Sequence, residues 1–538
     1  MSARSALATA LVAVAALVAS VVPAAPAQGQ SGSAPCDTTH WVGTWAADPS
    51  GTLGSGSSDQ TVRVILSPHI GGSALRVHLS NRFGRSPVTF NHASVALRQA
   101  GAGLVPGSSR PLTFGGLPTV TVPVGGEVTS DQAMLSFSAF QDLAVSVYLA
   151  APTGPATGHL IGRERSYVTV RGGGDHTTDD GSGAFPNATT TVNYVDGVDA
   201  LASTGIGAAV LFGDSITDGY ESSGGSSNEE QGGIDLNHRY PDYLARRLLG
   251  EAGGPRLSVV DAGVSGNRLL VDAQNMVSGM SGLSRLGTDV IGVPGVTDAI
   301  VLAGINDIAL LASAGQVESA LRQIVTRLHA AGIHTLLGTL SPAGTGLLNL
   351  GNLLPSIYID SSANAVRVAV NGWIRSGASG ADGVVDFDAA LRGASISDEL
   401  NAGFDSGDHV HPSYSGYKKM ADIVDLSSLR GATCGAGSIA RLATTLRVRA
   451  RARSGGRIHV SGSLIPAGRA NCTGDRVVVR ALSGGHTLFK RAVRVAPSCL
   501  FADTKSTKAR GRIEVRVGFA GSLSLLPSKT RSLYVHAR

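Results

Sequence analysis

The sequence predicts an α/β domain with a parallel sheet, flanked by an N-terminal β-sandwich and a smaller C-terminal β-domain. Two patterns favour this fold class. Between about residues 205 and 430, short apolar runs alternate with longer segments of helical periodicity, which is typical of a parallel sheet covered on both faces. On either side of this region, apolar and polar residues alternate in short runs broken by glycine and proline, which indicates antiparallel strands. The chain has 538 residues, enough for three such domains.

The first 27 residues have the composition of a secretory signal peptide. Arg4 supplies a positive charge, residues 6–22 are apolar, and Ala25-Pro26-Ala27 is a small-residue cleavage pattern. We therefore expect residues 1–27 to be removed and the protein to be secreted or associated with the cell wall. The alternative is a membrane anchor. The apolar run is shorter than the ~20 residues of a membrane span, and no later segment reaches that length.

Four cysteines follow the predicted cleavage site: Cys36, Cys434, Cys472 and Cys499. An even number of cysteines in an exported chain suggests two disulfides. Because Cys472 and Cys499 lie in one C-terminal segment, we expect them to pair with each other and Cys36 to pair with Cys434. The sequence alone allows three pairings. Zinc binding is the weaker alternative, because the chain has no Cys-x-x-Cys spacing.

The predicted N-terminal β-sandwich covers residues 41–204. Strand candidates with period-2 alternation are residues 61–66, 74–80 and 142–149. Frequent turn residues between such strands are typical of an antiparallel sandwich. One face of the third candidate carries only branched apolar residues: Leu143, Val145, Val147 and Leu149.

The predicted catalytic domain covers residues 205–430. Its strand candidates are residues 208–212, 257–263, 298–304, 334–340 and 383–387. Its helix candidates lie between them, at residues 241–253, 316–332, 362–375 and 414–429. Repetition of strand, helix and strand predicts a parallel sheet with helices on both faces.

The predicted C-terminal domain covers residues 438–538 and is strongly basic. Residues 436–538 carry 20 Lys and Arg but only 3 Asp and Glu, whereas the whole chain has a net charge of +5. A basic exported module suits an anionic surface such as teichoic acid, an acidic polysaccharide or anionic lipid. The alternative is a solvated, arginine-rich β-domain without a partner. Nucleic acid is not an expected partner, because the segment lacks interleaved aromatic residues for base stacking.

Polar turns follow the predicted strands of the central domain. Asp214 and Ser215 follow the first strand, Gly266 the second and Asn306 the third, and a segment at 408–411 precedes the last helix. The carboxyl ends of parallel strands meet at one edge of a sheet, where ligands bind in open α/β folds. We therefore expect these turns to converge there.

The side chains of these turns suit acyl transfer. Ser215 is the candidate nucleophile, and it needs a base that takes its proton. His411 is the candidate base, and Asp408 three residues earlier is placed to orient its ring. Preorganised donors for an oxyanion are the backbone N–H groups of Ser215 and Gly266 and the side-chain amide of Asn306.

Four sequence blocks, in this order, resemble those of the SGNH, or GDSL-type, hydrolases: GDSIT at 213–217, the glycine turn ending at Gly266, GIND at 304–307 and DHVH at 408–411. The resemblance implies the roles given above for the nucleophile, the base, the acid and the oxyanion donors. It also implies a flavodoxin-like three-layer fold and ester hydrolysis without a metal or other cofactor. The β-rich segment 41–212 is similar to the N-terminal part of some exported bacterial GDSL-type esterases.

The expected function is that of a secreted serine esterase, a carboxylic ester hydrolase that forms an acyl-enzyme on Ser215. Its ester substrate is a lipid, an aryl ester or an acetylated carbohydrate. One alternative is a carbohydrate O-acetylesterase acting on cell-wall or plant polysaccharide. A remote alternative is a non-catalytic surface-binding protein. A third alternative is a metal-dependent phosphoesterase, although such a site gives Ser215 and Asn306 no joint role. Its metal ligands would be Asp214, Asp218, Asp307, Asp408 and His411.

Alternatives also remain for single residues. Ser215 can act as a helix N-cap, and Asp214 as a hydrogen-bond acceptor within the turn. His409 competes with His411 as the base, but the Asp-x-x-His spacing and the proline that follows favour His411.

The apolar loop at 342–359 has two interpretations. It can cover the catalytic edge as a lid or acyl-chain wall, or it can form a short helix packed onto the core.

Overall fold

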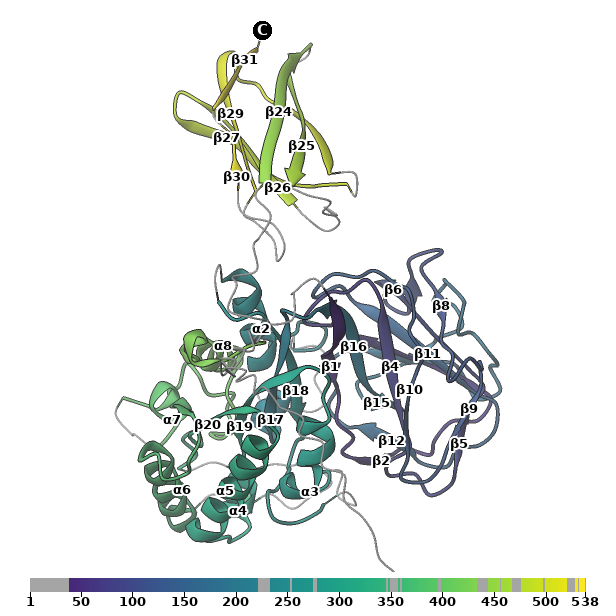
Figure 1. The fold of residues 1–538 in the computed structure, drawn as a ribbon, viewed down its shortest axis with the longest axis vertical. Helices are drawn as coiled ribbons and strands as arrows, with labels where there is room; N and C mark the ends of the chain where they lie inside the picture. Colours follow the sequence, from purple (N-terminus) through teal and green to yellow (C-terminus); the bar gives the residue numbers. More distant parts are fainter. Residues whose placement is uncertain are drawn as a thin grey trace, which may run out of the picture.

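A computed structural model describes most of the chain (Figure 1). The described residues are 38–220, 233–251, 254–273, 278–344, 347–348, 357–358, 360–394, 398–432, 444–454, 456–466, 476–496, 499–519, 528–530 and 532–537. The predicted signal segment 1–27 lies outside them, as do Cys36, Cys434 and Cys472. Signal cleavage and the disulfide pairing therefore stay predictions. In the described residues no helix has both the length and the apolar character of a membrane span.

The N-terminal part is built of antiparallel strands. They are β1 Thr39–Ala46, β2 Gly51–Leu53, β3 Gln60–Leu66, β4 Leu75–Ser80, β5 Val88–Phe90, β6 His92–Ala100, β7 Gly103–Leu104, β8 Arg110–Pro111, β9 Val120–Val122, β10 Glu127–Thr129, β11 Leu143–Leu149, β12 Ala156–His159, β13 Ser166–Val168, β14 Asn187–Thr189, β15 Val192–Asn193 and β16 Val195–Ser203. One sheet has the order β1-β16-β4-β10, and a larger one runs β14-β13-β3-β11-β6-β7. The alternating apolar face of β11 is fully buried in the core, as its period-2 pattern predicts.

The central part is an α/β unit. Its strands are β17 Gly207–Gly213, β18 Leu257–Gly263, β19 Val296–Leu302, β20 His334–Gly338, β21 Leu347–Leu348, β22 Ile357–Tyr358 and β23 Gly383–Val385. Its helices are α1 Ser215–Asp218, α2 Tyr240–Gly250, α3 Gly282–Leu286, η3 Gly287–Ile291, α4 Ile305–Ala309, α5 Ala314–Ala330, α6 Ser361–Arg375, α7 Phe387–Leu391, α8 Tyr414–Ile423 and η5 Leu426–Ser428.

Five strands of this unit form one parallel sheet in the order β18-β17-β19-β20-β23. Numbered along the chain, this is the 2-1-3-4-5 order of flavodoxin-like folds. Helix α8 contacts α2 and α7, and helix α5 contacts α3, α4 and α6. Figure 1 shows the sheet between these two groups. β17 and β18 are buried along their whole length, which fits their mainly apolar sequences; Ser258 and Asp261 of β18 are the exceptions.

Six predicted elements of the α/β unit end at least two residues earlier than expected, and two of them illustrate why. The strand expected at 383–387 stops at Val385, because the side chain of Asp386 caps α7 by accepting a hydrogen bond from the N–H of Ala389. The helix expected at 414–429 stops at Ile423, because Val424 has an extended backbone and the short helix η5 follows. Local capping thus sets both ends.

The N-terminal sandwich and the α/β unit share one continuous hydrophobic core. Strand β1 contacts β18, and the N–H of Gly43 in β1 donates to the carbonyl of Pro294 at 2.9 Å. A side chain at Gly43 would overlap Val293, since a Cβ there would lie 2.6 Å from its Cγ1. The sandwich is therefore closely packed against the α/β unit.

The apolar loop at 342–359 is described only in part. Its strands β21 and β22 pair antiparallel, Leu347 with Tyr358 and Leu348 with Ile357. Residues 345–346, 349–356 and 359 lie outside the described residues. Neither interpretation of this loop is tested.

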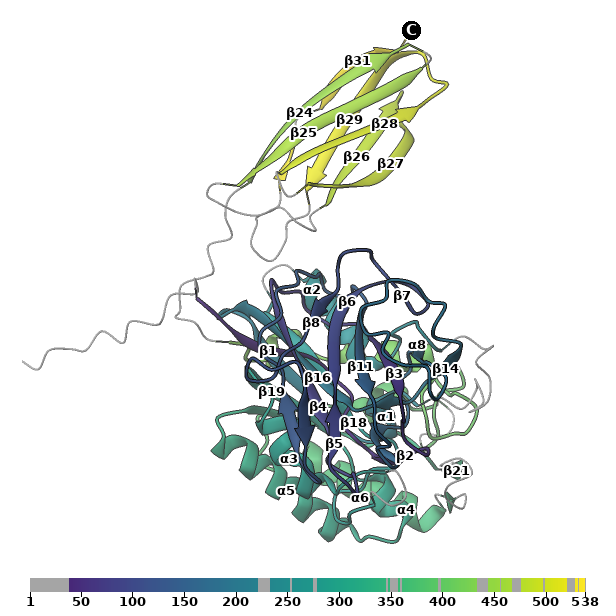
Figure 2. The same ribbon diagram turned by 90° about the vertical axis from the view of Figure 1, so that its right-hand side faces the viewer.

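The C-terminal part is a separate β-domain, which Figures 1 and 2 show apart from the other two. Its strands are β24 Thr444–Arg453, β25 Arg457–Pro466, β26 Arg476–Ser483, β27 His486–Arg494, β28 Leu500–Ser506, β29 Gly511–Phe519, β30 Ser528–Lys529 and β31 Leu533–Ala537. One antiparallel sheet is β24-β25-β28, and the other is β27-β26-β29-β30 with β31 on β29. The two sheets enclose a hydrophobic core of their own.

Candidate active site

The turn between β17 and α1 places Ser215 at the carboxyl edge of the parallel sheet. Asp214 is the N-cap of α1, and its carboxylate accepts a hydrogen bond of 3.1 Å from the N–H of Ile216. The turn requires glycine at 213, since a Cβ there would lie 2.1 Å from Thr217 Oγ1 and 2.4 Å from the carbonyl oxygen of Leu302. Ser215 is thus the first residue of a helix that starts directly at the end of a central strand.

The segment before α8 brings a histidine and an aspartate to this serine. Ser215 Oγ lies 2.8 Å from His411 Nε2, and His411 Nδ1 lies 2.6 Å from Asp408 Oδ2. The side chain of His411 is 1% exposed and that of Asp408 10%. Because the carboxylate accepts a hydrogen bond from the Nδ1–H group, the lone pair of Nε2 faces the serine hydroxyl. The arrangement lets His411 take the proton of Ser215.

The carboxylate of Asp408 is fixed in orientation and charge. Its Oδ1 accepts hydrogen bonds from the N–H groups of Val410 at 2.9 Å and His411 at 2.8 Å. Burial opposes its ionised form, but the hydrogen bond and charge of His411, with these backbone bonds, outweigh burial and lower the pKa of Asp408. Asp408 is therefore ionised at neutral pH, as an acid that orients an imidazole must be.

The pKa of Asp214, next to the serine, is shifted in the opposite direction from that of Asp408. Burial raises the pKa of its carboxyl to about 7, although the N–H of Ile216 and the charge of His411 work against this shift. Asp214 bonds the backbone of its own turn, in keeping with a structural role there.

The oxyanion candidates lie on two adjacent loops that contact each other. Asn306, in α4, donates from Nδ2 to the carbonyl of Asn267 at 3.0 Å, and Asn267 directly follows Gly266. Gly266 has a φ of +73°, which favours glycine. Within the described residues, the N–H groups of Ser215 and Gly266 have no hydrogen-bond acceptor. These two donors, with the second amide hydrogen of Asn306, remain available to a ligand.

The two other residues considered in this region have different partners. His409 has a side chain that is 57% exposed and pairs with Asp405 rather than with Ser215. Asp307 accepts hydrogen bonds from the N–H groups of Leu269 at 2.7 Å and Leu270 at 3.1 Å, so it holds the loop after Gly266. Asp214 and Asp307, two carboxylates of the alternative phosphoesterase site, thus accept hydrogen bonds from backbone N–H groups.

Two residues near the site have no motif that marks them in the sequence. The ring of Tyr220 lies against His411, with 4.5 Å between centroids and an interplanar angle of 57°. Buried Arg285 joins the ends of two strands, donating to the carbonyls of Gly213 at 2.7 Å and Ala262 at 2.9 Å. It also donates to Asn267 Oδ1 at 3.0 Å, so one guanidinium links the serine turn to the Gly266 loop.

Comparison with known proteins gives a family match for the central part. Residues 211–419 match the model of the GDSL-like Lipase/Acylhydrolase family. No curated protein matches the chain.

Solved structures also resemble part of the chain. A putative lipolytic protein of the G-D-S-L family from Desulfitobacterium hafniense is 20% identical over 41% of this chain and 97% of its own, with a TM-score of 0.28. A GDSL-like lipase from Bacteroides thetaiotaomicron is 18% identical over 42% of this chain and 88% of its own, with a TM-score of 0.30. An acetylxylan esterase from Geobacillus stearothermophilus is 20% identical over 41% of this chain and 94% of its own, with a TM-score of 0.28.

Proposed function

We propose that the protein is a serine esterase, a carboxylic ester hydrolase with Ser215 as the nucleophile. The match of residues 211–419 to the GDSL-like Lipase/Acylhydrolase family supports this proposal. The supporting observation is the buried hydrogen-bonded chain that runs from Asp408 through His411 to Ser215. Only acyl transfer uses all three groups together with unpaired backbone donors beside the serine.

In the acylation step, Ser215 Oγ bonds to the ester carbonyl carbon while its proton moves to His411 Nε2. Asp408 stabilises the imidazolium that forms. The negative charge on the former carbonyl oxygen is stabilised by the N–H groups of Ser215 and Gly266 and by Asn306. The carbon–oxygen bond to the alcohol then breaks, and the Nε2 proton passes to the leaving oxygen.

In the deacylation step, a water molecule bonds to the acyl carbon and gives one proton to His411 Nε2. The bond between the acyl carbon and Ser215 Oγ breaks, and the proton on Nε2 returns to the serine. The products are a carboxylic acid and an alcohol, and every group of the enzyme is restored.

Covalent labelling tests the nucleophile directly. We expect a fluorophosphonate to modify one serine, with the added mass on the peptide that contains Ser215, and to abolish hydrolysis of p-nitrophenyl esters. A panel from acetyl to palmitoyl esters, with phospholipid and acetylated xylan, then ranks the acyl and alcohol parts and separates a lipid or aryl esterase from a carbohydrate O-acetylesterase. Activity that resists the label but is lost with a chelator would instead support the phosphoesterase.

Export is part of the proposal, on the strength of the signal-like residues 1–27. Recovery of the protein from the medium with a mature N-terminus near Gln28 is the expected result in a bacterial host with a secretion pathway.

Asn306→Ala is expected to lower kcat for p-nitrophenyl acetate by about 10²–10³-fold, with little change in KM. The amide is buried, and its loss removes a donor that acts on the transition state. Asn371→Ala is a matched control, because Asn371 is equally buried and bonds the backbone of Leu340. A kcat that falls equally in both variants would mean that Asn306 acts only on stability.

A further inference from the structure

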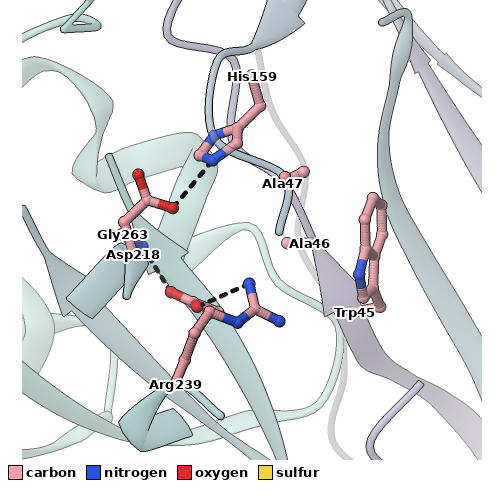
Figure 3. A pocket seen from close by; sticks show the side chains of 9 residues that line it. Trp45, Ala46, Ala47, His159, Asp218, Arg239 and Gly263 are labelled. Atoms are coloured by element: carbon pink, nitrogen blue, oxygen red, sulfur yellow. Dashed lines mark hydrogen bonds and ion pairs between the residues drawn. The ribbon is translucent and has the colours of Figure 1, made fainter. Parts of the chain in front are cut away.

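One histidine of the N-terminal sandwich reaches the turn of the nucleophile. His159, the last residue of β12, is 4% exposed, and its Nε2 lies 3.0 Å from Oδ1 of Asp218, the last residue of α1. Its Nδ1 lies 2.8 Å from the carbonyl oxygen of Asp48. Figure 3 shows the imidazole pointing at the Asp218 carboxylate, to which a dashed line joins it; both side chains line a small pocket.

The partners of His159 require a doubly protonated ring. A carbonyl and a carboxylate both accept, so each ring nitrogen must donate a proton. Burial disfavours the charged ring, but the charge and hydrogen bond of Asp218 outweigh it and raise the pKa of His159 from 6.5 to about 9. The other charged or titratable groups lining the pocket are Asp261 and Arg239, and these two form an ion pair of 3.1 Å.

The carboxylate of Asp218 connects this imidazolium to the oxyanion loop. Its second oxygen, Oδ2, accepts from the N–H of Ser265 at 2.9 Å and from the Ser265 hydroxyl at 2.6 Å. Ser265 immediately precedes Gly266, the proposed oxyanion donor. Close packing fixes the same region, since a Cβ at Gly263 would lie 2.2 Å from the backbone nitrogen of Asp218.

We propose that His159 is a positioning residue for ester hydrolysis, which orients the Gly266 N–H through Asp218 and Ser265. The inference rests on the proposed esterase function. In this proposal, a residue of the N-terminal sandwich helps to position a catalytic group of the neighbouring domain. The charge of the ring matters because a neutral ring leaves one nitrogen lone pair facing an acceptor.

His159→Gln is the test, because glutamine keeps one donor but cannot carry a charge. With p-nitrophenyl acetate we expect kcat to fall by about 10- to 10²-fold with KM nearly unchanged, as for a misplaced transition-state donor. The intact enzyme is protonated at His159 below the raised pKa, so its kcat should fall as pH rises through about 9. In the His159→Gln variant, kcat should not show this fall, the alkaline limb of the pH profile.

His69→Gln is the matched control. His69 is also buried and also belongs to the sandwich. Its ring lies 2.7 Å from the carbonyl oxygen of Val259 and 2.9 Å from the carboxylate of Asp242, and both of these residues belong to the α/β unit. Asp242 caps α2 and does not bond the Gly266 loop. The control should lose stability but keep kcat and the alkaline limb.

The outcomes separate the two proposals. If the intact protein hydrolyses no ester, the proposed function fails. If it is active and both histidine variants lose the same activity, or the alkaline limb persists in His159→Gln, His159 is structural and the positioning role is wrong.

An independent observation concerns the C-terminal domain. Alternate residues of β24 are exposed arginines, while Val448 and Ala450 between them pack against the core. Side chains two residues apart on a strand are separated by about 7 Å. The ion pairs of this domain, within the described residues, join Arg491 to Asp503 and Arg516 to Glu514. The uncompensated row is Arg447, Arg449, Arg451 and Arg453.

Beside this row lies a mainly polar face without acidic residues, in which Leu500 and Ala502 are the apolar positions. The positions opposite the arginines are Ser463, Ser461, His459 and Arg457 in β25, and then Leu500, Ala502, Thr504 and Ser506 in β28. A groove of about 630 Å³ runs over the first half of this face, lined by Arg447, Arg449, Ser461 and Ser463. The aromatic residue that lines this groove, Phe501, is only 5% exposed and packs in the core, so the face offers little on which nucleic acid bases stack.

We infer that this face, the β24 arginine face, binds a linear polymer of sugar or polyol units that carries a phosphate or carboxylate at each repeat. Evenly spaced guanidinium forks match evenly spaced oxyanions. The serine hydroxyls add hydrogen-bond donors and acceptors for the polymer's oxygens.

The test measures binding of the full chain to poly(glycerol phosphate), polygalacturonate and single-stranded DNA at fixed salt. We expect the combined variant R447Q/R449Q/R451Q/R453Q to bind one or both of the first two polymers at least about 10²-fold more weakly. The control R476Q/R480Q/K490Q/R494Q removes the same charge from the other sheet. Equal losses in both variants, no binding by the intact protein, or tighter binding of DNA would each overturn this inference.

Discussion

Ser215→Ala lowers kcat for p-nitrophenyl esters by about 10⁴–10⁶-fold, the range expected when a triad nucleophile is removed. The oxygen of Ser215 forms the only covalent bond between enzyme and substrate in the proposed reaction. Its one hydrogen bond in the described residues goes to His411, so the alanine variant should keep its fold and its substrate binding. Steady-state kinetics on purified protein, with fluorophosphonate labelling, give the measurement.

Ser258→Ala provides the matched control for this prediction. Ser258 is a fully buried serine of the adjacent strand β18, and its hydroxyl has no hydrogen-bond partner among the described residues. This variant should keep its activity and its labelling. A loss of less than ~10²-fold in Ser215→Ala would contradict the assignment of the nucleophile.

Asp408→Asn is expected to lower kcat by about 10³–10⁴-fold, because it reverses the tautomer of His411. The asparagine oxygen replaces Oδ1 and accepts from the N–H groups of Val410 and His411, as the carboxylate does. The amide NH₂ then faces Nδ1, which must accept. The proton moves to Nε2, and the ring no longer accepts from Ser215.

Asp405→Asn is the control within the same loop. Asp405 uses one oxygen to accept from the N–H groups of Gly407 and His409 and the other to pair with His409 Nδ1. The motif is the same, but it orients an exposed ring away from the serine. Its activity should change by less than about 10-fold. Equal losses in the two variants would show that Asp408 only holds the loop.

Much of the catalytic fold could be predicted from its sequence, because each buried strand is a nearly continuous apolar run. β17 and β18 lie within one or two residues of their predicted ranges. The family match confirms the predicted GDSL-type domain. The meeting of Ser215 with His411, 196 positions apart, follows from a general rule, since parallel strands end at one edge.

The supporting contacts could not be predicted in this way. His159 and Arg285 carry no motif, and their partners lie on other elements: Asp218 is 59 positions from His159, and Gly213 is 72 positions from Arg285. Such contacts depend on how the sandwich docks and how side chains fill the interior. Local periodicity contains no information on either.

The shared core of the sandwich and the α/β unit has an evolutionary consequence. A recombination break near residue 205 would separate β1 from β18 and leave apolar surface of both exposed to water. It would also leave Asp218 without its cation. We therefore expect the two parts to be inherited together, as one unit of selection. The C-terminal domain, with its separate core, is free to be exchanged between lineages.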